Sequence, residues 1–167
     1  MKQVYLFWLM IGLGVAFSCD TETGKKADTP HVAFYTLKNQ NTLGTGCELD
    51  VATAQEKEVI IANDEILSYH AAEHYFVLTA AAVNRLKNIK NQTPFYLKVD
   101  NAVVYAGFLM PGYLSLACLD IIVIDPLAYN NIIRVRYDYA NTSQPTTDSR
   151  NNATLLAALQ NQGKLEK

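Results

Sequence analysis

The sequence predicts an α+β fold in which a mostly antiparallel sheet is built around one central hairpin and carries two packed helices. Residues 94–108 hold two runs rich in Val, Tyr and Phe on either side of Asp100-Asn101, a pair that tolerates positive φ in a tight turn. Residues 80–90 and 152–162 place apolar side chains at helical spacing. The other apolar segments are short or alternate with polar residues, which is typical of strands.

Length and charge limit the classes of protein that fit. A chain of 167 residues with a formal net charge of −2 and scattered Lys and Arg lacks the clustered positive charge of a nucleic-acid surface. We expect a signal peptide over residues 1–18, a flexible polar tether over 19–30, and a single domain over 31–167.

The first residues have the pattern of an export signal. Lys2 is followed by twelve uncharged residues, 4–15, and then by Ala16-Phe-Ser-Cys19. This run is shorter than the roughly 20 residues that a transmembrane helix needs, and its charged start and small-residue end match a secretory signal peptide. The mature protein is therefore expected outside the cytoplasm.

Two processing outcomes fit the end of this signal. Ala16 and Ser18 occupy the −3 and −1 positions for ordinary signal-peptidase cleavage before Cys19. The same four residues resemble a bacterial lipobox, in which the cysteine becomes the lipid-modified first residue, although Ala16 stands where Leu is usual and Phe17 where a smaller residue is preferred. Lipidation predicts a lipoprotein in the bacterial cell envelope, facing the periplasm or the surface.

Cysteine parity favours lipidation. Cleavage before Cys19 leaves three cysteines in an oxidising compartment, whereas a lipid on Cys19 leaves Cys47 and Cys118 as a pair. We predict a disulfide between Cys47 and Cys118, and the alternative is two unpaired, half-buried thiols.

Strands are predicted in the first half of the chain at residues 31–38, 47–51 and 58–62, separated by Asn- and Gly-rich turns. Residues 65–79 allow two interpretations. They form two short strands that turn at Ala71-Ala-Glu73, or a helix, because Ala and Glu are good helix formers.

Capping residues mark the two helices. Thr79 is the expected N-cap of the first, and Asn151 or Asn152 that of the second, which ends at Gly163 as a left-handed C-terminal residue.

Between the two helices we expect a buried strand over 116–124, interrupted by Asp120, and a half-buried strand over 131–139. Asp120 is a functional carboxylate or, more simply, lies at a strand end or pairs with Arg134 or Arg136.

One stretch resembles a known family. The chain places three parts in order: a strand at Phe76-Val-Leu78, a helix capped by Thr79, and the hairpin from Pro94 to Phe108. This order is similar to the head of the first periplasmic domain of SecD. It also resembles small Bacteroidetes lipoproteins of unknown function, whose tails look like residues 148–165. The resemblance spans about residues 58 to 165 and implies an α+β fold. It implies no catalytic residue, and translocase function does not follow because the membrane-spanning part of SecD is missing.

The strongest catalytic motif is His70-Ala-Ala-Glu-His74, which matches the His-x-x-Glu-His pattern of inverzincin metalloproteases. On a helix, His70 and His74 would share a face as zinc ligands, and Glu73 would act as the base. A small zinc-dependent hydrolase is therefore the alternative function. The simpler interpretation is two surface or half-buried histidines with no metal site.

Our leading hypothesis is a non-enzymatic, lipid-anchored binding or structural module without a cofactor. Ten tyrosines provide an aromatic surface for a peptide or glycan, or else the core and rim of a sheet. The expected partners are a membrane, reached through the lipid on Cys19, and an unidentified envelope protein, peptide or glycan, but not nucleic acid.

Overall fold

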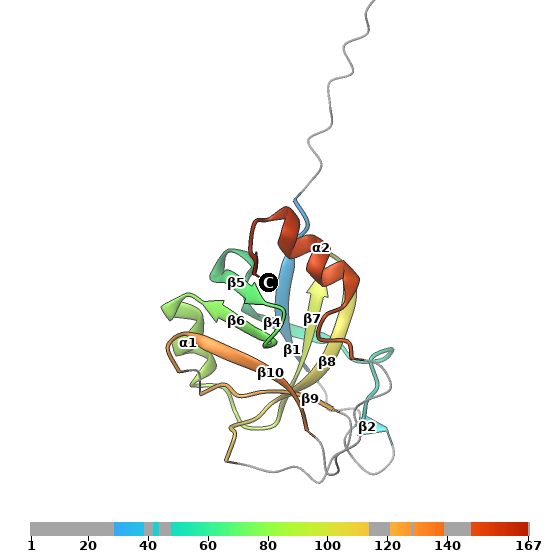
Figure 1. Cartoon of the computed structure of the whole chain (residues 1–167). Coiled ribbons are helices and arrows are strands. Elements are labelled where there is room, and N and C mark those ends of the chain that lie inside the picture. Colours follow the sequence, from blue (N-terminus) through green and yellow to red (C-terminus); the bar gives the residue numbers. More distant parts are fainter. Residues whose placement is uncertain are drawn as a thin grey trace, which may run out of the picture.

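The computed structural model describes residues 29–38, 42–43, 48–113, 121–127, 129–138 and 148–166. These form a nine-stranded mixed sheet, a separate two-stranded pair and two α-helices (Figure 1). The strands are β1 (Val32–Leu37), β2 (Thr42–Leu43), β3 (Glu48–Leu49), β4 (Glu56–Ile61), β5 (Ile66–His70), β6 (Tyr75–Leu78), β7 (Thr93–Val99), β8 (Ala102–Leu109), β9 (Ile121–Ile124), β10 (Ile132–Asp138) and β11 (Leu165–Glu166). The helices are α1 (Ala80–Leu86) and α2 (Ala153–Asn161), with a 3-10 turn η1 at Asn63–Glu65.

The order of strands in the main sheet is β11-β5-β6-β10-β9-β8-β7-β1-β4. Neighbours β8 and β9 are parallel, as are β11 and β5, and the other neighbouring pairs are antiparallel. The predicted α+β class with two helices is confirmed, and the sheet is mixed.

The central hairpin forms as its sequence predicts. Val99 on β7 pairs with Ala102 on β8, so Asp100 and Asn101 make the two-residue turn, with Asp100 at φ 53°. The backbone N–H of His31 donates to Oδ1 of Asp100 at 2.8 Å, which joins this turn to the start of β1.

The core lies inside the curve of the sheet. Four strands lie between β1 and β6 in the order of the sheet. Even so, the rings of Phe34 on β1 and Phe76 on β6 meet edge to face, with their centroids 5.2 Å apart. The sheet therefore curls until its two halves face each other. Helix α2, drawn in red in Figure 1, contacts β1, β7 and β11 and covers one end of this core.

Local signals place both helices. The Thr79 side chain accepts a hydrogen bond from the N–H of Ala82, and the Asn152 side chain accepts one from the N–H of Thr154. Helix α1 ends at Leu86, earlier than predicted, because Asn88 and Ile89 close tighter turns onto carbonyls three residues back. Gly163 takes the expected positive φ after α2.

Residues 65–79 form a hairpin, and the helical alternative is wrong. The end of η1 leads into β5, which turns over residues 71–74 into β6. Each strand has a further neighbour, β11 beside β5 and β10 beside β6. These long-range ladders outweigh the helix propensity of Ala and Glu.

Several predictions fall on residues that the structure does not describe. The signal peptide, most of the tether and the anchor Cys19 lie there, as do Cys47, Cys118, Asp120 and the first part of the predicted strand over 116–124. Among the residues that are described, no helix is long and apolar enough to cross a membrane.

Candidate functional site

Four polar side chains form a row across neighbouring strands on the outer face of the sheet. Glu166 on β11 pairs with His70 on β5, His70 pairs with Tyr75 on β6, and Tyr75 pairs with Arg134 on β10. Directly opposed residues in a sheet have side chains close enough to interact. We call Glu166, His70, Tyr75 and Arg134 the cross-strand row.

Each member of this row contacts the next one along the row. Nε2 of His70 lies 2.9 Å from Oε2 of Glu166, and the His70 ring stacks on the Tyr75 ring with centroids 4.1 Å apart. The guanidinium carbon of Arg134 lies 5.3 Å from the centre of the Tyr75 ring. Desolvation, with the carboxylates of Glu73 and Glu166, raises the pKa of Tyr75, so its phenol stays protonated at neutral pH. The ring of Tyr75 thus holds Arg134 in place.

The hairpin separates the motif residues that the zinc hypothesis needs together. His70 ends β5 and pairs with Glu166, whereas His74 lies in the turn at φ 54°. Burial, together with the positive charge of Arg150, lowers the pKa of His74. In the described part of the chain, no group of three or more His, Cys, Asp or Glu residues is placed to hold a metal ion. Zinc ligation by this motif requires His70 and His74 to share one helical face. The strand and turn structure rules this out.

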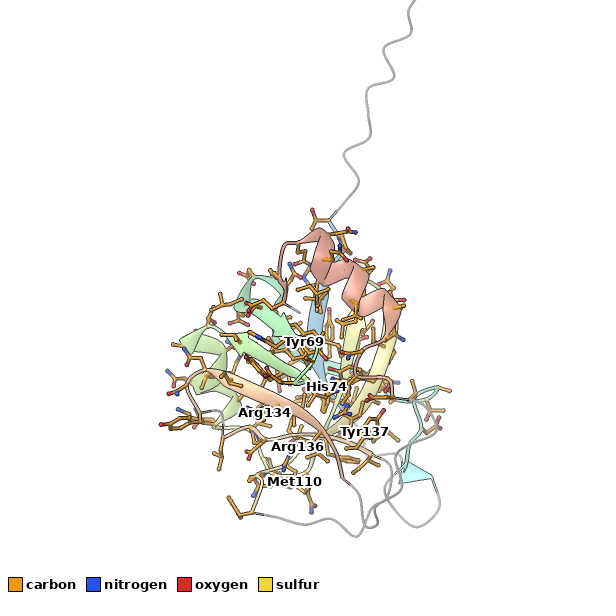
Figure 2. The ribbon with its side chains drawn as sticks, viewed as in Figure 1. Tyr69, His74, Met110, Arg134, Arg136 and Tyr137 are labelled. Atoms are coloured by element: carbon orange, nitrogen blue, oxygen red, sulfur yellow. The ribbon has the colours of Figure 1, made fainter. Side chains whose placement is uncertain are left out.

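A solvent-facing pocket continues the outer face beside Arg134. Its volume is about 270 Å³. Arg134 and Arg136 lie two residues apart on β10, so both point away from the core that receives Ile133 and Val135 (Figure 2). The residues that line this arginine pocket are Asp125, Leu127, Tyr129, Ile132, Arg134 and Arg136.

A tight turn presents Tyr129 to the arginine pocket. Asn130 and Asn131 have φ of 52° and 62°, and the N–H of Ile132 donates to the carbonyl of Tyr129 at 3.0 Å. Two left-handed residues inside such a turn are the pattern of a type I′ turn, and Asn tolerates this conformation. Tyr129 is 81% exposed and Leu127 is 48% exposed, so both offer apolar surface to a ligand.

The positive charges of the arginine pocket have no ionic partner among the described residues. Salt bridges in that part of the chain involve other side chains, and neither Arg134 nor Arg136 takes part in one. The nearby Asp125 carboxylate instead accepts hydrogen bonds from the N–H of Gly112 and the N–H of Leu127, each at 2.9 Å. The predicted pairing of Asp120 with one of these arginines lies outside the described residues and stays a prediction.

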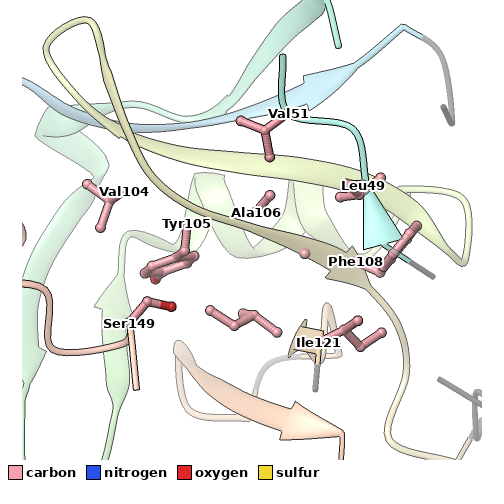
Figure 3. A pocket seen from close by; sticks show the side chains of 10 residues that line it. Leu49, Val51, Val104, Tyr105, Ala106, Phe108, Ile121 and Ser149 are labelled. Atoms are coloured by element: carbon pink, nitrogen blue, oxygen red, sulfur yellow. The ribbon is translucent and has the colours of Figure 1, made fainter. Parts of the chain in front are cut away.

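A second pocket, of about 290 Å³, is lined mainly by residues of β8 and β9 (Figure 3). Leu49, Phe108 and Ile121 line one end, and Tyr105 and Ser149 lie at the other. Its walls are mainly apolar and carry no charged side chain among the lining residues. This pocket has less to distinguish one ligand from another than the arginine pocket does.

The tyrosines divide between core and surface. Tyr69, Tyr96 and Tyr105 are buried, as the simpler interpretation predicts, whereas Tyr113 and Tyr129 are highly exposed. Sequence reasoning did not select Arg134 and Arg136 as binding residues. The available signal was the alternation of Arg with Ile and Val along residues 132–136, which places both arginines on the polar face of one strand.

Comparison of this chain with protein-family models, with curated proteins and with solved structures gives no match. The resemblance of residues 58 to 165 to SecD and to small Bacteroidetes lipoproteins stays a prediction.

Proposed function

We propose that this protein is a lipid-anchored component of the bacterial cell envelope that displays its α+β domain as a non-enzymatic binding module. The export signal and the lipobox-like Ala16-Phe-Ser-Cys19 support the anchor. The arginine pocket supports the binding role, and it is the observation that carries the proposal.

The arginine pocket is suited to binding because its charges are positioned before a ligand arrives. The Arg134 guanidinium lies over Tyr75, which is itself stacked on His70, so less side-chain freedom is lost on binding. Arg136 projects from the same face of a strand that is paired on both sides. Rigid strands hold such groups more precisely than loops do.

The zinc-hydrolase alternative receives no support from the arrangement of His70, Glu73 and His74. Its two histidine ligands needed a shared helical face, and the chain places His70 on a strand and His74 in a turn. We therefore do not propose it.

Replacing Cys19 tests the anchor. In membranes of the native host, we expect Cys19→Ala to move the protein from the membrane fraction to the soluble fraction, because the lipid site is lost. Cys47→Ala is the matched control and should stay in the membrane fraction. Intact mass of the wild-type protein should show an N-terminal lipidated Cys19. Membrane retention of Cys19→Ala would contradict the anchoring proposal.

A further inference from the structure

We propose that the arginine pocket binds an acidic sugar, with the sugar carboxylate on Arg134 and Arg136 and the sugar ring against Tyr129. This inference rests on the proposed binding function and names the chemical class of its ligand. It uses side chains on strand β10 and on the turn that precedes it.

The case for a carboxylate comes from charge. Two guanidinium groups project from one side of β10, and no ion pair in the described residues neutralises them. Asp125 also lines the pocket, but its carboxylate accepts hydrogen bonds from two backbone N–H groups, and the two arginines outnumber it. The chain as a whole has a net charge of −2, so this excess of positive charge is a local feature. Arg donates two parallel hydrogen bonds to a carboxylate, a geometry that a neutral ligand does not match.

The case for a sugar ring comes from Tyr129 and Leu127. Tyr129 is 81% exposed at the side of the pocket, and its ring face carries partial negative charge. The polarised C–H groups on one face of a pyranose ring pack favourably on such a surface. The Tyr75 ring already contacts His70 and Arg134. Tyr129 is the aromatic side chain among the residues that line the pocket, and it is open to a ligand.

A ligand on the outer face of β10 meets side chains, which suits a compact ring that carries one charged group. Strand β10 pairs with β6 over Ile132–Arg134 and with β9 over Val135–Asp138, so each ladder covers one half of the strand. An extended peptide that adds to the backbone of the sheet is therefore the competing ligand in the experiment below.

The experiment titrates the full chain, solubilised in detergent, with trigalacturonic acid and follows binding by calorimetry. The fully methyl-esterified trisaccharide is the matched control ligand, because it keeps the rings and removes the negative charge. We expect saturable binding of the acid that weakens at high salt, and at least about tenfold weaker binding of the ester.

Variants test the assignment of residues. Arg134→Gln and Arg136→Gln should each weaken binding of the acid by about tenfold, since each removes charge-assisted hydrogen bonds. Tyr129→Ala should weaken the acid and the ester alike, because it removes the ring contact. Lys87→Gln, which removes a positive charge from the end of α1, should bind like wild type. Thermal unfolding of each variant checks that the fold is intact.

Four outcomes would overturn this inference. Equal binding of acid and ester would show that the arginines do not recognise a carboxylate. Binding that Lys87→Gln weakens as much as Arg134→Gln does would show attraction to overall charge. Saturable binding of an acidic pentapeptide that depends on Arg134 and Arg136, with none of the trisaccharide, would reject the sugar but keep the binding module. Failure of all these probes to bind would reject the sugar, while the anchor is judged separately by Cys19→Ala.

Discussion

Tyr69 and Tyr105 are both buried in the core, but only one of their hydroxyl groups has a hydrogen-bond partner in the described structure. The Tyr69 hydroxyl lies 3.0 Å from the carbonyl of Arg150 and 2.9 Å from Oδ1 of Asn151. The Tyr105 hydroxyl is buried with no such partner. Burial raises the pKa of both phenols, so both stay protonated across the physiological range.

Phenylalanine substitutions should therefore have opposite effects at these two residues. Tyr69→Phe removes a satisfied hydrogen bond and should lower the free energy of unfolding by about 1 kcal/mol. Tyr105→Phe removes an unsatisfied polar group and should raise it by up to about 1 kcal/mol. Urea denaturation measures both. Destabilisation by Tyr105→Phe equal to that of Tyr69→Phe would mean that the Tyr105 hydroxyl is hydrogen-bonded in solution.

At the scale of elements, the parallel junction of β8 and β9 depends on one glycine. Gly107 pairs with Ile122, and a Cβ added at Gly107 would clash with the carbonyl oxygen of Ile122. This oxygen belongs to the backbone of the sheet, so a small side-chain movement does not relieve the clash. Close approach, and not a positive φ, is the reason for glycine here.

Gly107→Ala should lower the free energy of unfolding by about 3 kcal/mol, the upper end of the usual cost of overpacking. Hydrogen exchange should become faster in β9. Gly163→Ala is the comparison, because it has open space around its Cβ but a φ of 68°, and it should cost about 1 kcal/mol without affecting β9. Equal exchange in β9 for the two variants would contradict this role of Gly107.

At the scale of the whole molecule, the sheet has one strongly protected edge and one short edge. Strand β4 begins with the exposed, charged residues Glu56, Lys57 and Glu58, and β11 at the other edge has two residues. Charged or very short edge strands discourage pairing with other chains. The outer face that carries the arginine pocket, and not a sheet edge, is therefore the surface on which we propose recognition.

The predicted disulfide is also a property of the whole chain, because Cys47 and Cys118 are far apart in sequence. The intact mass of the exported protein should increase by two hydrogen atoms on reduction. Reduction should also lower the free energy of unfolding by roughly 2–4 kcal/mol, since it releases a long closed loop. A Cys47→Ser, Cys118→Ser double variant should not respond to reductant. An unchanged wild-type mass would show that the two thiols are free.

The sequence alone determined the elements whose signals are local. The turn at Asp100-Asn101, the N-caps Thr79 and Asn152, and the C-terminal Gly163 act on residues within one or two turns of themselves. Their effect does not depend on the rest of the chain, so they could be predicted without it. The predictions of export and lipidation likewise rest on a contiguous signal at the N-terminus.

Tertiary structure alone decided the choice of hairpin over helix for residues 65–79 and the composition of the candidate site. The local propensities of that segment are balanced, and its pairing with β10 and β11 determines the outcome. The cross-strand row joins His70 to Glu166 and Tyr75 to Arg134, residues that lie far apart in the sequence. Strand order brings them together, and strand order is set by burial of the shared core, which no local pattern records.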